Sequence, residues 1–210
     1  MIDAGNKQFR LLSIVDLERA ILVQSSAFNN DPFWQYLIPN PEKRTKMLPQ
    51  FFSVFLKVNI HNGTAYGIST PIEGVAVWSA PNQKSIDLSG FIGSDLVKLS
   101  LNGFLFPFLK AFKIFIRFEN MQKKHAPNPH YYLNTIAVLP ESQGKGLASK
   151  LIRPFLEKAD EESVAAYTET MTLANVGLYE HFGFHCVEQY HVPKTELNIW
   201  ALYRPTKLRR

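Results

Sequence analysis

Residues 133–146, Leu-Asn-Thr-Ile-Ala-Val-Leu-Pro-Glu-Ser-Gln-Gly-Lys-Gly, decide the fold of this chain. Residues 131–139 are apolar and rich in β-branched side chains, which predicts a buried strand. Pro140 ends that strand, because proline has no N–H to donate to a sheet. From residue 147 onward, apolar side chains recur at helical spacing. The segment therefore predicts a strand, a glycine-rich turn and a helix in succession.

The turn between this strand and helix carries Gly144, Lys145 and Gly146. The first N–H groups of a helix have no partner within it and lie at the positive end of its dipole. Glycines allow an anion to approach those groups closely. The turn therefore indicates a phosphate or pyrophosphate site, and an ordinary strand-to-helix turn is the alternative. The lysine lies between the glycines and a third spaced glycine is missing, which excludes a Walker A loop and a dinucleotide fingerprint.

Two motifs in this chain resemble signatures of the GNAT superfamily of N-acetyltransferases. Residues 138–148, Val-Leu-Pro-Glu-Ser-Gln-Gly-Lys-Gly-Leu-Ala, resemble its coenzyme A signature. Residues 175–184, Asn-Val-Gly-Leu-Tyr-Glu-His-Phe-Gly-Phe, resemble its second signature, an asparagine with a tyrosine four residues later and then Gly-Phe. The resemblance covers residues 130–203, and the first 130 residues match only in general plan. Residues 153–176 are also similar to the branch that includes puromycin acetyltransferases.

Length and composition indicate one globular domain. The chain has 210 residues, of which 46% are hydrophobic and 20% charged, so residues 1–210 are interpreted as a single domain with a helical insertion at about 85–126. The only cysteine, Cys186, fits a reducing compartment, and we expect no metal site. The N-terminus lacks the apolar core of a signal peptide and no apolar run reaches membrane-spanning length. These features predict a soluble cytoplasmic protein, and the net charge of +5 is modest for a nucleic-acid binder.

Two segments before the central strand have alternative interpretations. Phe33 and Trp34 follow loop residues 29–32, and they either pack in the core or form one wall of an acceptor site, where the family places its first helices. Residues 104–118 are apolar, with Lys110, Lys113 and Arg117 at helical spacing. This pattern fits either a membrane-surface helix or a helix that turns its charged side to water and its aromatic side to the domain. We favour the second interpretation.

The resemblance implies acetyl-coenzyme A as the acyl donor. Backbone groups of the turn would bind its pyrophosphate, and those of the preceding strand would bind its pantetheine arm, which fills a gap between two splayed strands in this family. The amide near Val138 would polarise the acetyl oxygen. Asn175 would bind the pantetheine arm or nearby backbone, and a helix N-cap is its alternative role. The expected donor-binding residues are Ile136, Ala137, Val138, Gln143, Gly144, Lys145, Gly146, Leu147, Ala148 and Asn175.

Two side chains are candidates for proton transfer. Tyr179 matches the general acid of the family, and a phenol that titrates near 10 stays protonated at neutral pH, so that it can donate a hydrogen bond to the departing thiolate. Glu169 is the first candidate for the base, because it lies on the strand expected to flank the acetyl group, where it would also contact the acceptor. The alternative interpretation is that the Glu169 carboxylate faces outward and takes no part in the reaction. Glu119 and Asp31 are weaker candidates.

These features predict a mixed α/β domain of GNAT type. Its sheet should be strongly twisted and mostly antiparallel, with six to seven strands and flanking helices. The expected function is transfer of an acetyl group to a primary amine of a small molecule, by direct attack in a ternary complex. A non-catalytic acyl-coenzyme A sensor and an enzyme acting on protein tails are the alternatives. We expect no nucleic-acid or membrane partner, and either a monomer or a homodimer.

Overall fold

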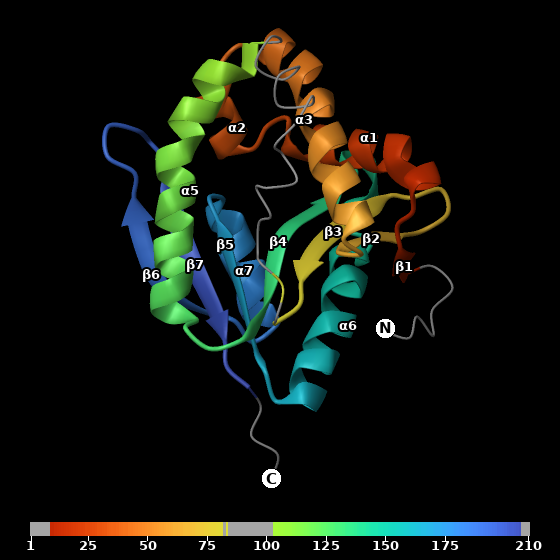
Figure 1. Ribbon diagram of the computed structural model, residues 1–210, viewed down its shortest axis with the longest axis vertical. Helices are drawn as coiled ribbons and strands as arrows, with labels where there is room; N and C mark the ends of the chain where they lie inside the picture. Colours follow the sequence, from red (N-terminus) through yellow and green to blue (C-terminus); the bar gives the residue numbers. More distant parts are fainter. Residues whose placement is uncertain (1–8, 82, 84–102, 207–210) are drawn as a thin grey trace.

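A computed structural model describes residues 9–81, 83 and 103–206. They form one seven-stranded sheet in the order β1-β2-β3-β4-β5-β7-β6 (Figure 1), in which only the pairing of β4 with β5 is parallel. The prediction of a mostly antiparallel sheet of six to seven strands flanked by helices is therefore confirmed. Residues 85–102 of the proposed insertion, and the N-terminal residues considered for a signal peptide, lie outside the described ranges.

The described residues form seven strands and six α-helices. The strands are β1 (Phe9–Leu11), β2 (Ala65–Ile68), β3 (Gly74–Ser79), β4 (His130–Val138), β5 (Ala165–Thr170), β6 (His185–His191) and β7 (Asn198–Arg204). The helices are α1 (Leu17–Phe28), α2 (Pro32–Leu37), α3 (Pro41–His61), α5 (Leu105–His125), α6 (Leu147–Glu162) and α7 (Leu173–His181), with short 3₁₀ turns at η1 (Ile14–Asp16) and η4 (Pro140–Ser142). α6 continues through Pro154, which lies in its interior.

Helices cover both faces of the sheet. The side chains of Val75 and Val77 lie with α1 and α3, whereas those of Ala76 and Trp78 lie with α6 and α7. Further along the sheet, Tyr167 of β5 packs against α5 on the same face as α1. We call these two sides the α1/α5 face and the α6/α7 face. Because side chains alternate along a strand, the two faces decide which residues meet in the site described below.

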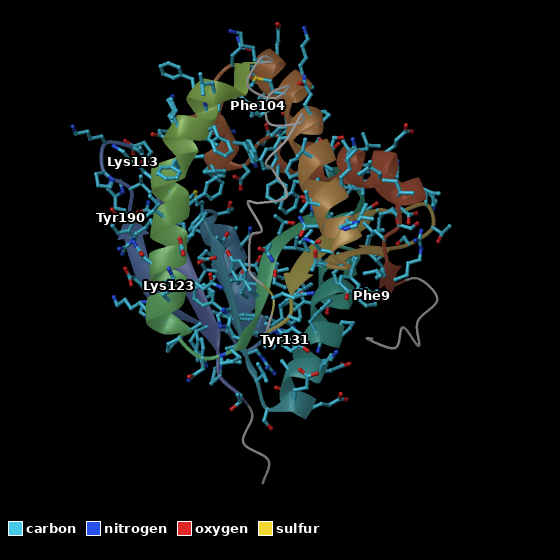
Figure 2. The ribbon with its side chains drawn as sticks, in the orientation of Figure 1. Phe9, Phe104, Lys113, Lys123, Tyr131 and Tyr190 are labelled. Carbon is cyan, nitrogen blue, oxygen red and sulfur yellow. The ribbon has the colours of Figure 1, made fainter. Side chains whose placement is uncertain are left out.

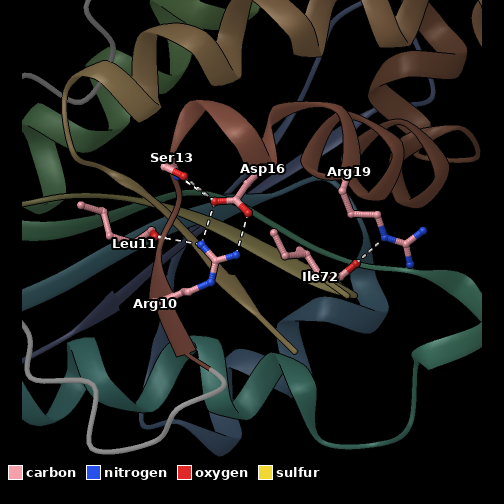
Figure 3. Close-up of polar contacts among 6 residues, drawn as sticks. All are labelled: Arg10, Leu11, Ser13, Asp16, Arg19 and Ile72. Atoms are coloured by element: carbon pink, nitrogen blue, oxygen red, sulfur yellow. Dashed lines mark hydrogen bonds and ion pairs between the residues drawn. The ribbon is translucent and has the colours of Figure 1, made fainter. Parts of the chain in front are cut away.

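A network of charged groups anchors α1 beside β1 (Figure 3). Arg10 makes two bonds to the Asp16 carboxylate, at 2.7 and 2.6 Å. The backbone N–H and the hydroxyl of Ser13 both donate to Asp16 Oδ2 at 2.9 Å. Arg19 Nε donates to the carbonyl of Ile72 in the β2–β3 turn at 2.7 Å. The start of α1 is thus fixed to two strands, and this orients the rest of the helix across β4.

Helix α5 lies along β6 and β7 (Figure 1), and its apolar residues divide between two sides. Ala111, Ile114 and Met121 are buried against the sheet. Phe106 and Phe112 are 74% and 55% exposed, so the expectation that the aromatic side chains of this helix face the domain is wrong for these two. No helix in the described ranges combines the length and the apolar character needed to cross a bilayer.

One carboxylate on β6 ties this strand to α5. Glu188 is bonded to Arg117, to Lys124 Nζ at 2.8 Å and to His125 Nε2 at 2.6 Å. The Arg117 guanidinium also stacks over the Tyr190 ring, 3.9 Å from its centroid, and Figure 2 shows Tyr190 beside the helix. Hydrogen bonds from Lys124 and His125 lower the pKa of Glu188 to about 2.

The Glu188→Gln variant is expected to lose about 1–2 kcal/mol of unfolding free energy at pH 7, since charged hydrogen bonds are partly screened at this edge. A carboxyl whose pKa is depressed in the folded state contributes stability above its unfolded pKa, and this is lost as pH falls through the folded value. The difference from the unaltered protein should therefore shrink between pH 4.5 and about 2. Urea unfolding at pH 7 and pH 3 measures both effects.

Glu119→Gln is the matched control for this prediction. Its carboxylate is bonded only to Lys123 among the described residues, and both side chains are well exposed on the outer side of α5. This change should cost less than about 0.5 kcal/mol. Equal losses for the two variants would contradict the anchoring role of Glu188.

Candidate active site

The parallel strands β4 and β5 pair at one end and diverge at the other. Their register runs from His130 opposite Ala165 to Leu133 opposite Thr168, and no further pair is formed. β4 nevertheless continues to Val138 and β5 to Thr170. We call the gap between residues 134–138 of β4 and residues 169–170 of β5 the seam, and the Leu133–Thr168 pair its apex. This is the splayed arrangement that the resemblance implied.

A β-bulge in β4 marks the start of the seam. Val77 of β3 pairs with Thr135 and Trp78 pairs with Leu133, so Asn134 is an extra residue without a partner on β3. A bulge bends its strand and increases the local twist, which turns β4 away from β5. Gln24 of α1 is fully buried over this point and donates from Nε2 to Thr135 Oγ1 at 3.1 Å. The bulge and α1 therefore act together to hold the seam open.

Two amides of β4 face the seam. The N–H of Leu139 donates to the carbonyl of Glu73, which precedes β3. Because amides alternate sides along a strand, Ala137 also turns its amide to β3, and Ile136 and Val138 turn theirs to the seam. The Val138 carbonyl agrees with this direction, since it accepts from Gln143 Nε2 at 3.3 Å. Of the three β4 residues expected to bind the donor, Ala137 thus lies with its side chain in the core and its amide on the far side.

The glycine turn lies at the open end of β4 and leads into α6. Gly144 and Gly146 have φ of +76° and +75°, a conformation that disfavours other residues, and a Cβ at either position would meet no atom within 4 Å. Gly146 is the N-cap of α6 and supplies no side chain to its first amides. Lys145, like Gln143, is exposed, and its Nζ lies 3.5 Å from Ser142 Oγ. The first amides of α6, those of Leu147 and Ala148, therefore have no capping side chain in the turn.

Tyr179 lies at the apex on the α6/α7 face. Its ring is buried and packs edge-on against Phe184, with centroids 5.8 Å apart. Its hydroxyl is hydrogen-bonded to Thr168, whose own hydroxyl donates to the Leu133 carbonyl at 2.9 Å. Burial raises the pKa of Tyr179 well above the ordinary value, although the Thr168 bond opposes this. The phenol is therefore a hydrogen-bond donor across the whole neutral range.

Glu169 lies beside the apex on the α1/α5 face. The Tyr132 hydroxyl donates to Glu169 Oε2 at 2.7 Å. Burial raises the pKa of Glu169 to about 7, and the neighbouring hydroxyls of Tyr132 and Tyr167 limit the rise. The other carboxylate oxygen, Oε1, is buried and makes no hydrogen bond of ordinary geometry. A carboxyl with this pKa can accept and release a proton near neutral pH.

The remaining predicted residues lie around the seam at different depths. Asn175 is inside α7 and donates to Thr170 Oγ1 at 3.4 Å, and Thr172 is the N-cap of that helix, so the alternative role of Asn175 as the N-cap is wrong. Phe33 is half-buried between α2 and α5, with its ring 5.9 Å from that of Phe115. Trp34 is buried in the core against Phe51 and Phe52.

The two weaker base candidates lie elsewhere. Asp31 caps α2 by accepting from the Phe33 amide at 3.0 Å, and it is also hydrogen-bonded to Thr172. Burial raises its pKa. Glu119 is on the outer side of α5 with Lys123. The structure therefore brings only Glu169, of the three candidate carboxylates, to the apex.

Three residues at the apex were missed by the sequence analysis: Tyr132, Asn134 and Thr168. Tyr132 and Asn134 lie in or beside the quoted segment, and because side chains alternate along a strand both lie on the α1/α5 face. A polar residue at 134 inside an otherwise apolar strand was a usable signal. The pairing of Tyr132 with Glu169 was not, because the two residues are 37 positions apart and meet only through the parallel register.

A sheet that splits between two parallel strands, with an uncapped helix start at one end and a phenol and a carboxylate at the other, defines an enzyme of the N-acetyltransferase class. The sequence model of the Acetyltransferase (GNAT) family matches residues 113–184. This match spans β4, the glycine turn and Tyr179, and it supports an acetyltransferase of this superfamily. Enzymes of the family generally take their acetyl group from acetyl-coenzyme A.

Known proteins agree with this assignment. An uncharacterized N-acetyltransferase of Schizosaccharomyces pombe is 28% identical over 177 residues, which cover 80% of this chain and 70% of that protein. The histone acetyltransferase HPA2 and related acetyltransferase of Corynebacterium glutamicum superposes with a TM-score of 0.66 at 19% identity, over 96% of this chain and 97% of the other. Arylalkylamine N-acetyltransferase 2 of Aedes aegypti gives 0.60 at 16% identity, over 97% and 100%. The two solved structures show a shared fold.

Proposed function

We propose that this protein transfers the acetyl group of acetyl-coenzyme A to a primary amine of a small molecule, by direct attack while both substrates are bound. One observation carries the proposal: Tyr179 and Glu169 lie on opposite faces of the sheet at the same apex. An acetyl group at that point would have a proton donor on one side and a proton acceptor on the other. No covalent acyl-enzyme is needed.

The donor would lie along the seam with its pyrophosphate at the glycine turn. Amides of Gly144, Gly146 and the first turn of α6 would bind the phosphates at the positive end of the helix dipole. The amides of Ile136 and Val138 face the seam, where an extended arm would take the place of a missing strand. We assign the polarisation of the acetyl oxygen to Ile136 rather than to Val138, because Ile136 is nearer the apex where the Tyr179 hydroxyl lies.

The chemistry follows from the two faces. Glu169 takes one proton from the ammonium form of the acceptor, and the nitrogen lone pair then attacks the thioester carbon. The Ile136 amide stabilises the negative charge that develops on the carbonyl oxygen. As the carbon–sulfur bond breaks, the nitrogen gives up a second N–H proton, which the sulfur takes up to leave as the thiol, while Tyr179 donates a hydrogen bond to that sulfur. The raised pKa of Tyr179 favours this hydrogen bond over full transfer of its own proton.

The acceptor would approach on the α1/α5 face. Phe33 stands between α2 and α5 on that face, which supports an apolar group beside the amine. The name of the Aedes aegypti neighbour, an arylalkylamine acetyltransferase, fits this choice, whereas the name of the Corynebacterium neighbour points to protein acceptors. The half-buried positions of Phe33 and Glu169 favour a small amine over a protein tail.

Titration calorimetry with acetyl-coenzyme A tests the donor site. Binding to the unaltered protein is expected, and a variant with Gly144→Ala and Gly146→Ala should bind about 10-fold or more weakly, because each Cβ enters the space in front of the helix amides. Gly63→Ala is the matched control: this glycine also has positive φ and open space around its Cβ, but it ends α3. Unchanged affinity in the double variant would contradict the assignment.

Acetyl transfer itself is tested by thiol release in the presence of 2-phenylethylamine, tyramine, agmatine and a lysine-containing peptide. Release with at least one of the three small amines supports the proposal. Release with the peptide alone would replace it by a protein acceptor. Binding of acetyl-coenzyme A with no release for any amine would overturn the proposed acceptor class.

A further inference from the structure

The side chain of Asn134 has an unused hydrogen-bond acceptor at the apex. Its Nδ2 donates to Ser79 Oγ at 2.9 Å and to the Tyr132 carbonyl at 3.3 Å. A carbonyl oxygen only accepts hydrogen bonds, so the Tyr132 contact fixes which end of the amide is nitrogen. Asn134 Oδ1 is buried and has no hydrogen-bond partner among the residues that the structure describes. Leaving such an acceptor unpaired costs about 1–3 kcal/mol, and an N–H of a bound substrate that reached this atom would remove that cost.

A second acceptor faces Asn134 from β5. In the parallel register, the pair after Leu133 and Thr168 would be Asn134 with Glu169, and this is the first pair that the seam separates. Both side chains lie on the α1/α5 face, since Asn134 contacts Ser79 there and Glu169 contacts Tyr132. Glu169 Oε1 is buried as well and makes no hydrogen bond of ordinary geometry among the described residues, although the Tyr167 hydroxyl interacts with this carboxylate. An amide oxygen of β4 and a carboxylate of β5 thus flank the place where the acceptor nitrogen would attack.

We propose that Asn134 Oδ1 binds the one hydrogen that the acceptor nitrogen keeps, and that it thereby makes the enzyme selective for primary over secondary amines. This inference rests on the proposed function. A primary ammonium has three N–H bonds: one proton goes to Glu169, one leaves with the thiol, and one remains in the product amide. A secondary ammonium has only two, so its product has no N–H. Only a primary amine can therefore keep the hydrogen bond to Asn134 through the loss of both protons and into the product amide.

The test compares each small amine that the enzyme acetylates with its N-methyl derivative. The measured quantity is the ratio of kcat/KM for the primary amine to kcat/KM for the N-methyl amine. Asn134→Leu keeps the shape of the side chain and removes the acceptor, so the ratio should fall about 10-fold through loss of the primary amine alone. Asn134→Ala serves the same purpose if the leucine variant does not fold, as judged by thermal unfolding and by binding of acetyl-coenzyme A.

Thr135→Val is the matched control on the same bulge. It removes a buried hydrogen bond, that from Gln24, but it leaves Asn134 Oδ1 in place, so the ratio should not change. An unchanged ratio in folded Asn134 variants, or an equal fall in Thr135→Val, overturns the inference while the acetyl transfer stands. Failure of the unaltered protein to acetylate any small amine instead overturns the proposed function, and the inference with it.

Discussion

Replacing Glu169 by glutamine is expected to lower kcat about 100- to 1,000-fold, the usual contribution of a positioned general base. Glutamine keeps the shape and still accepts the hydrogen bond from Tyr132, but it cannot take a proton from the ammonium group. Binding of acetyl-coenzyme A, measured by calorimetry, should be unchanged, because the donor site is formed by backbone groups of β4 and α6. Steady-state kinetics with a small amine measures the loss.

The pH profile gives this prediction a second readout. Glu169 has its pKa raised to about 7, and only the ionised form acts as a base. In the unaltered enzyme, kcat/KM should therefore rise with pH up to about 7 and then level off, falling about tenfold for each unit below that value. The inflection should be absent in Glu169→Gln. Glu119→Gln should keep both the rate and the inflection, and a loss of either there would point to the wrong carboxylate.

Tyr179→Phe is expected to lower kcat about 100-fold without weakening the binding of acetyl-coenzyme A. The phenylalanine keeps the packing against Phe184 but cannot donate a hydrogen bond to the departing thiolate. Because burial raises the pKa of Tyr179 above its ordinary range, the unaltered enzyme should lose no activity through ionisation of this phenol up to pH 10. Calorimetry and the kcat profile measure these expectations.

Tyr131→Phe is the control for this substitution. Tyr131 lies on the same α6/α7 face, but its hydroxyl donates to Glu162 at 2.7 Å, away from the seam. Loss of that hydroxyl should leave kcat unchanged. If Tyr179→Phe retains full activity, the proton or hydrogen bond to the thiolate must come from another group or from water.

The sequence predicted the fold well where one strand or helix carried its own signal. The apolar run that forms β4 and the helical repeat of α6 are local patterns. The glycine turn was predicted from its residue types, since Pro140 ends the strand and Gly144 and Gly146 precede the helix. Tyr179 was found in the same way, since a spacing of four residues within one helix does not depend on the rest of the chain. Glu169 was found through its strand, although its burial depended on α5.

Features that depend on two distant segments could not be read from the chain. The bulge at Asn134 exists only as a mismatch between β3 and β4, and the alternation within β4 alone does not show it. The bond between Tyr132 and Glu169 needs the parallel register. For Trp34 the sequence left two roles open, because an aromatic residue beside a loop has the same pattern whether it faces a substrate or packs in the core. The structure places it in the core.

The seam also divides the protein mechanically. The half-sheet β1–β4 and the half-sheet β5–β7 share four residue pairs and the hydroxyl contact from Thr168 to Leu133, whereas β3 and β4 share six. The line between the halves thus has fewer pairs than the neighbouring line between β3 and β4, and α6, which contacts both β4 and β5, adds to the connection. A molecule bonded to both sides of that line would join the halves as a missing strand does. A ligand that fills the seam should therefore also make the whole sheet stiffer and more stable.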